Sequence, residues 1–273
     1  MLSDVTMGQF FPGKSVMHRL DPRIKMCLTV YFIVLIFCSK NFVTLGATIL
    51  MSLLGVVLSK VPLKLYLKSM KPILFIVVFT GVLNLFYGTG DPIFTLGFIH
   101  ITRNGIVNSI MIAVRIVVLI LISSILTFTT SPTQLTDAIE RLLKPLALLH
   151  VPVHEFAMMM TIALRFIPTL IEETSKIKNA QAARGADFSE GGLIKRARAL
   201  IPILIPLFVS SFRRASDLAN AMECRCYTGG EGRTRMNVLH AGIVDFVAVL
   251  LVVFAGAAVM LINRYAPGYS MSL

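Results

Sequence analysis

Cysteine and histidine are the residues of this chain that could hold a metal ion, and their spacing argues against such a site. Cys224 and Cys226 form a single Cys-x-Cys pair, which is a weak metal signal on its own. His150 and His154 have a spacing that suits zinc on a helix, but Pro152 lies between them and disfavours the helical turn that zinc would need. We therefore expect no metal site.

The other polar residues do not predict an enzyme. The five histidines are scattered along the chain, and no pair of carboxylates lies near a serine or cysteine nucleophile. We also expect no phosphate-binding loop of the Gly-x-x-x-x-Gly-Lys-Ser/Thr type, so that ATP would have to be bound by other chains. The chain should accordingly have no catalytic residues and no cofactor of its own.

Arg184 and Arg225 are the residues that we expect to contact another protein, because each ends a long helical pattern. The pattern over residues 153–185 closes on Gly185, a plausible left-handed helix cap, and the pattern over residues 190–227 runs into a glycine-rich turn. A single arginine at a helix end commonly offsets the helix dipole. Two such arginines indicate more, because the rigid guanidinium fork suits carboxylates in a partner's groove.

These arginines lie in a polar segment, residues 130–236, that reads as three helices. The first covers residues 131–150 and is amphipathic, with apolar residues at helical spacing. The two long patterns follow, and each has an apolar middle, at residues 156–171 and 199–212. Both middles are short and interrupted for membrane spans. Two prolines in the last pattern predict a bend.

Composition places the whole chain in a membrane. Of its 273 residues, 56% are hydrophobic and only 15% are charged, and the mean hydropathy is +0.80. The net charge is nevertheless +12, which indicates basic loops on the cytoplasmic side of a membrane protein. Nucleic-acid binding is the competing explanation for the basic charge, and the apolar runs are too long for that kind of soluble fold.

The expected fold is an all-α integral membrane protein with about five transmembrane helices and a cytoplasmic domain of three helices. We divide the chain into an N-terminal segment with four spans (1–129), the cytoplasmic helices (130–236) and a final span with an external tail (237–273). The five apolar runs cover residues 24–39, 42–59, 72–87, 105–129 and 238–262. A seven-span topology, in which both apolar middles also cross, keeps each terminus on the same side.

Orientation follows from lysine and arginine, which favour the cytoplasmic side. They cluster before the first span and between the second and third, which places the N-terminus and the 130–236 segment inside and the C-terminus outside. Two charges lie within spans, Arg115 and Asp245. An Arg–Asp pair between helices is the structural explanation for them, and a proton or ion pathway is the functional one.

Several of these features together resemble the transmembrane coupling component of energy-coupling factor (ECF) transporters. That family carries an Ala-Arg-Gly motif at the end of each of two long, crossing coupling helices. Ala183, Arg184 and Gly185 match the first motif fully. Only the arginine matches in the second, Cys224, Arg225 and Cys226, which leaves the geometry of that helix end open. The opening segment also resembles the family at Pro12, Gly13, Ser15, His18, Arg19, Leu20, Asp21, Pro22, Arg23 and Lys25.

The resemblance implies a non-catalytic subunit of an ATP-driven importer in the bacterial cell membrane. Two ABC-type ATPase subunits, which bind ATP and Mg, would each receive one arginine-tipped helix end. A separate substrate-binding membrane subunit, the S component, would rest on the apolar faces of these helices and release a vitamin or metal ion inside. A self-contained secondary transporter or channel is the alternative, although Asn84 is one of few polar groups in the first three spans and no internal repeat is visible.

Overall fold

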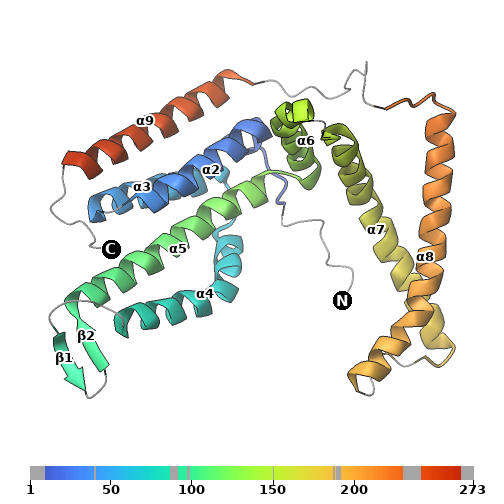
Figure 1. Cartoon of the computed structure of the whole chain (residues 1–273), viewed down its shortest axis with the longest axis horizontal. Helices are drawn as coiled ribbons and strands as arrows, with labels where there is room; N and C mark the ends of the chain where they lie inside the picture. The colour runs from blue at the N-terminus through green and yellow to red at the C-terminus, as the bar shows by residue number, and fades with distance from the viewer. Residues whose placement is uncertain are drawn as a thin grey trace. The chain divides into compact units, whose positions relative to one another are not determined.

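The computed structural model describes residues 10–39, 41–86, 92–96, 99–149, 151–186, 188, 192–229 and 241–265. The chain forms two compact units (Figure 1). The bundle unit consists of Gln9–Leu135 and Leu239–Leu273, and the arm unit includes Thr136–Val238. The described residues are helical apart from short connections and one two-stranded hairpin, which confirms the all-α membrane class.

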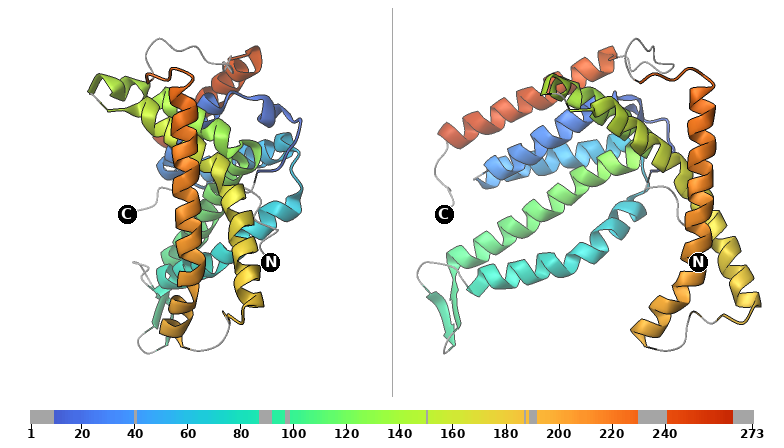
Figure 2. Two further views of the ribbon diagram at one scale, coloured as in Figure 1. Left: turned by 90° about the vertical axis from the view of Figure 1, so that its right-hand side faces the viewer. Right: turned by 45° about the vertical axis from the view of Figure 1, so that its right-hand side comes forward.

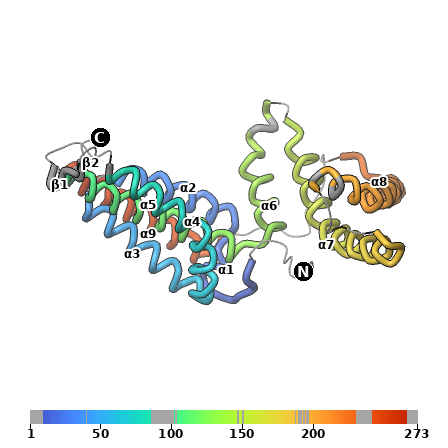
Figure 3. The backbone as a smooth tube through the Cα atoms, turned by 90° about the horizontal axis from the view of Figure 1, so that it is seen from below, coloured from blue at the N-terminus to red at the C-terminus, as the bar shows by residue number. Residues whose placement is uncertain are grey.

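The bundle unit is built around one central helix. Helix α5 packs against α2, α3 and α4, while α9 packs against α2 and α3, and Figures 2 and 3 show these helices running side by side. The bounds are α1 (Val16–Arg19), α2 (Pro22–Cys38), α3 (Phe42–Ser59), α4 (Leu63–Phe86), α5 (Arg103–Thr129) and α9 (Ile243–Tyr265). Strands β1 (Pro92–Leu96) and β2 (Ile99–Thr102) pair antiparallel between α4 and α5, where the sequence analysis assigned no regular structure.

Apolar side chains hold this unit together only where helices touch. One cluster joins Phe32 and Ile36 of α2 to Val118 and Ile122 of α5. Elsewhere the helices expose large apolar side chains, such as Phe75, Phe79, Leu250 and Phe254. Exposed apolar surface on this scale indicates contact with lipid or with another membrane protein.

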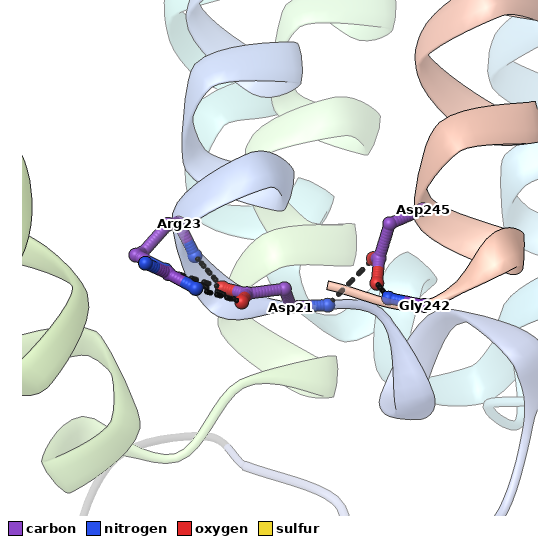
Figure 4. Close-up of polar contacts among 4 residues, drawn as sticks. All are labelled: Asp21, Arg23, Gly242 and Asp245. Atoms are coloured by element: carbon purple, nitrogen blue, oxygen red, sulfur yellow. Dashed lines mark hydrogen bonds and ion pairs between the residues drawn. The ribbon is translucent and has the colours of Figure 1, made fainter. Parts of the chain in front are cut away.

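The start of α2 is a polar centre that joins three helices. The Asp21 side chain accepts a bond from the Arg23 backbone N–H and pairs with its guanidinium at 2.6 Å, and Pro22 lies in the first turn, so Asp21 caps the helix. The buried Asp245 carboxylate accepts from the Asp21 N–H at 2.7 Å and from the Gly242 N–H at 2.8 Å (Figure 4). Helix α9 is thereby tied to the start of α2.

Lys25 completes the polar centre from the next turn of α2. It is buried, and its ammonium group donates to the backbone oxygen and hydroxyl of Thr129 and to the hydroxyl of Thr130, at 3.0–3.2 Å. The last carbonyls of a helix have no partner within the helix, so a buried ammonium group there compensates them. Helix α5 is therefore fastened to α2 at the same end as α9.

The Arg115–Asp245 pair, which was the structural explanation for these two charges, does not form. Arg115 donates from Nη2 to the Ser39 backbone oxygen at 2.8 Å, just beyond the C-terminal end of α2. Asp245 binds at the N-terminal end of the same helix. Helix α2 has 17 residues, so the two charges act roughly 25 Å apart, each on backbone groups that have no partner within the helix because they lie at its end.

Among the described residues, six helices are long and apolar enough to cross a membrane. Four of them overlap the expected spans at residues 42–59, 72–87, 105–129 and 238–262, and α2, the remaining expected span, has 17 residues. The other two are α7 and α8, the long helices of the arm unit. Helices α7 and α8 are thus the two that a seven-span topology would add to the five expected spans.

The arm unit contains the two long helices that the sequence predicts. Helix α7 (Val153–Ala183) and helix α8 (Leu193–Glu223) have 31 residues each and cross one another, as Figures 1 and 2 show. Helix α6 (Pro132–Leu143) precedes them and continues as a 3-10 helix (Lys144–Leu149) from the residue before Pro145. The axis of α8 changes direction along its length in Figure 1, as expected from Pro202 and Pro206.

Candidate partner-binding site: two capped helix ends

The end of α7 is closed by a Schellman motif around the first candidate arginine. The Gly185 N–H donates to the Ala182 carbonyl at 3.0 Å, and the Ala186 N–H donates to the Gln181 carbonyl at 3.0 Å. Gly185 has φ +87°, the left-handed conformation that this motif requires. Arg184 is the residue immediately before the turn, and its side chain is exposed.

The end of α8 has the same hydrogen bonds despite its two cysteines. The Cys226 N–H donates to the Glu223 carbonyl at 2.8 Å, and the Tyr227 N–H donates to the Met222 carbonyl at 3.0 Å. Cys226 takes the left-handed position with φ +55°, where α7 has Gly185. The cysteines therefore leave the helix end intact, and Arg225 is exposed at the position equivalent to Arg184.

Both arginines combine a fixed backbone with a free side chain. The Schellman bonds define where each helix stops, and the guanidinium extends from that point with five N–H donors. Cys224 and Cys226, which flank Arg225, are also exposed free thiols. The arrangement suits binding of carboxylates or carbonyl oxygens that a partner presents in a groove.

The crossing of α7 and α8 separates the two arginines. Glu173 of α7 binds Arg214 of α8 at 2.7 Å, and further along α7 the Gln181 amide approaches the Pro202 carbonyl at 3.5 Å. From the first contact to the second, the residue number rises along α7 and falls along α8, so the two helices run in opposite directions. Arg184 and Arg225 therefore lie at opposite ends of the helix pair.

The faces of the two helices between their ends are apolar and exposed. On α7 they include Phe156, Met159 and Met160, and on α8 Leu204, Ile205, Phe208, Val209 and Phe212, each at least 43% exposed. These residues fall within or beside the apolar middles that the sequence predicts. A surface of this kind binds lipid or the apolar face of another protein.

The predictions for the histidine pair and for the phosphate-binding pattern have different outcomes. His154 pairs with Glu140 at 3.0 Å, which joins α7 to α6, and His150 lies outside the described residues. The expectation that the phosphate-binding pattern does not occur is wrong, because Gly8, Gly13, Lys14 and Ser15 match its letters.

The described part of that match lacks the structure of a phosphate-binding loop. Such a loop joins a strand to the start of a helix. Here residues 10–14 form no regular structure, and the helix that follows, α1, has four residues. The Ser15 hydroxyl is already bonded to His18 at 2.7 Å, and a side chain at Gly13 would meet the same imidazole ring. The letters occur here in an N-terminal segment folded around His18.

Replacing Cys226 by glycine should stabilise the end of α8. The left-handed conformation costs a residue with a side chain about 1–2 kcal/mol, and part of the gain is offset by the greater freedom of glycine when unfolded. We expect a net gain of about 0.5–1 kcal/mol, seen as roughly two- to fivefold slower hydrogen exchange of the Tyr227 N–H. Gly185→Ala is the matched control and should act in the opposite direction on the end of α7. Equal exchange in the Cys226→Gly chain would contradict the assigned cap.

Comparison with known proteins places this chain in one class of membrane protein. The family model described as "Cobalt transport protein" (CbiQ) matches residues 13–236. An "Energy-coupling factor transporter transmembrane protein EcfT" of Acidaminococcus fermentans is 52% identical over 90% of this chain and 91% of its own. Proteins of the same description from Ruminiclostridium cellulolyticum and Listeria monocytogenes are 53% and 41% identical over 88% and 96% of this chain, and 90% and 99% of their own.

The chain therefore belongs to this family, the transmembrane (T) components of energy-coupling factor transporters. It is a multi-pass membrane protein of a transporter, as its apolar helices require.

Proposed function

We propose that this chain couples ATP hydrolysis by two ABC-type ATPase subunits to the movement of a substrate-binding S component in a bacterial cell membrane. The observation that carries the proposal is the pair of equivalent helix ends, each with a Schellman motif and an exposed arginine, Arg184 or Arg225. Each ATPase would hold one arginine in a groove, and ATP with Mg would be bound by those subunits.

The rest of the arm unit supports a role between two kinds of partner. Movement of an ATPase groove would be transmitted along α7 or α8, because a helix is stiff over its length. The exposed apolar faces of these helices would support the S component, which would release a vitamin or another micronutrient inside the cell. In this arrangement the N-terminus and the arm unit are cytoplasmic and the C-terminus is external.

Purification from the native membrane tests the proposal. Two ATPase subunits and a third, apolar membrane protein should co-elute with this chain, and the complex should hydrolyse ATP. The matched sample is the chain purified alone and placed in lipid vesicles, which should neither hydrolyse ATP nor take up substrate. Uptake by the chain alone, driven by an ion gradient, would overturn the proposal and favour a self-contained secondary transporter.

A further inference from the structure

We propose that Glu173, Ser210 and Arg214 form a fulcrum that fixes the crossing of α7 and α8 and makes the two arginine tips move together. This inference rests on the proposed function for its meaning in transport. It assigns a positioning role to residues that lie away from both tips. Three observations carry it: the contacts at the crossing, its position along the helices, and the open space beside it.

The contacts use both oxygens of a single carboxylate. Ser210 donates its hydroxyl to Oε1 of Glu173, and Arg214 donates from Nη2 to Oε2 at 2.7 Å. Ser210 and Arg214 are one helical turn apart, so they share a face of α8. Both charged side chains are partly shielded, with 21% of Glu173 and 40% of Arg214 exposed. One residue of α7 is thus held by two of α8, which fixes a point more firmly than a single exposed ion pair would.

The cluster lies at matching positions on the two helices. Arg184 follows Glu173 by about 11 residues, and Arg225 follows Arg214 by the same interval. The segment from the cluster to the tip arginine, which is the lever arm of each helix, is therefore roughly 16 Å long. The helices run in opposite directions, and the arms therefore extend to opposite sides of the crossing. With equal arms, rotation of the helices about this point displaces both tips by similar distances. Two ATPase subunits that move together would then drive the T component evenly.

The space beside the crossing allows such a rotation. An open groove of about 270 Å³ separates the first half of α7 from the second half of α8. Arg214 lines it, together with Ile162, Phe166, Leu170, Ser211, Ala215, Leu218, Ala219 and Met222. Close-packed helices would resist a change of crossing angle, because interiors transmit strain. An apolar groove next to a polar attachment point lets the angle change while the point of contact stays in place.

Spin labels on the two arms measure the crossing directly. Asn179 and Asn220 are exposed and each lies about five residues before its tip arginine, so both are replaced by cysteine in a chain whose four native cysteines are serine. We expect a narrow distance distribution between the labels, and a broad one after Glu173→Gln. In the full complex, substrate taken up per ATP hydrolysed should fall by roughly fivefold or more. The controls Glu172→Gln and Arg213→Gln change exposed neighbours of the same types and should change neither quantity.

A charge exchange distinguishes a fulcrum from a general folding defect. Arg214→Glu alone should uncouple the complex, and adding Glu173→Arg should restore a substantial part of the uptake per ATP. An unchanged label distance and unchanged uptake per ATP in Glu173→Gln would overturn the fulcrum, as would a charge exchange that restores nothing. These outcomes are separate from those for the proposed function, which depends on whether ATPases bind to Arg184 and Arg225. Uncoupling by the tip variants but not by Glu173→Gln would refute the fulcrum alone.

Discussion

Replacing Arg184 and Arg225 together by alanine is expected to abolish substrate uptake while the chain remains folded in the membrane. Both side chains are exposed, so their removal leaves no buried group unpaired. Arginine in the centre of an interface commonly contributes about 2 kcal/mol or more, which is roughly 30-fold in affinity for each site. The loss should therefore appear as failure of the ATPase subunits to co-purify, or as ATP hydrolysis without uptake.

The control for the two tip arginines is Arg213→Ala, which removes an exposed arginine of α8 that lies about 12 residues before Arg225. It should leave assembly and uptake close to normal. Arg184→Lys and Arg225→Lys should still impair coupling, because lysine keeps the charge but lacks the planar fork. Normal assembly and normal uptake in the double alanine variant would show that the helix ends are not the ATPase contacts.

Gly256→Val is expected to lower the stability of the bundle unit clearly. A side chain at Gly256 of α9 would overlap the Tyr31 hydroxyl of α2, and its Cβ would lie 2.7 Å from Cδ1 of Leu35. Small residues at such positions let helices approach closely within a membrane. Overpacking costs about 1–3 kcal/mol, so the midpoint of thermal unfolding in detergent should fall by several degrees.

The matched control is Gly46→Val, because a Cβ at Gly46 of α3 would meet no atom within 4 Å. It should unfold at nearly the temperature of the unmodified chain. If Gly256→Val were equally stable, the close packing of α9 on α2 would be wrong. That result would also weaken the assignment of the Asp245 contacts, since these hold the first turn of the same helix.

Features that depend on neighbouring residues were predictable. Asp21 and Pro22 start α2 in a way that residue type alone favours, because a capping side chain and the residue after it act within one turn. Gly185 ends α7 for a similar reason. A cysteine at position 226 does not predict how α8 ends. The structure shows that Cys226 adopts the left-handed conformation that glycine would adopt. The hydrogen bonds from residues 226 and 227 to α8 are retained there in spite of the side chain.

Features that join distant residues were not predictable from residue type. A pair between Arg115 and Asp245 was the structural explanation for these charges, but each binds backbone groups at a different end of α2. The burial of Lys25 against Thr129 and Thr130 also depends on where α5 ends in space. A charge within an apolar run must find some partner, and the sequence does not say which one is within reach.

The sequence by itself determined the membrane class, the long helices and the two arginine-bearing ends, because composition, periodicity and capping act over a few turns of chain. Only the tertiary structure decided that α7 and α8 run in opposite directions and that Glu173 binds Ser210 and Arg214 at their crossing. That contact joins residues about 40 positions apart. Such pairings are set by how whole helices pack, and many charged residues along the arm unit would satisfy the same local pattern.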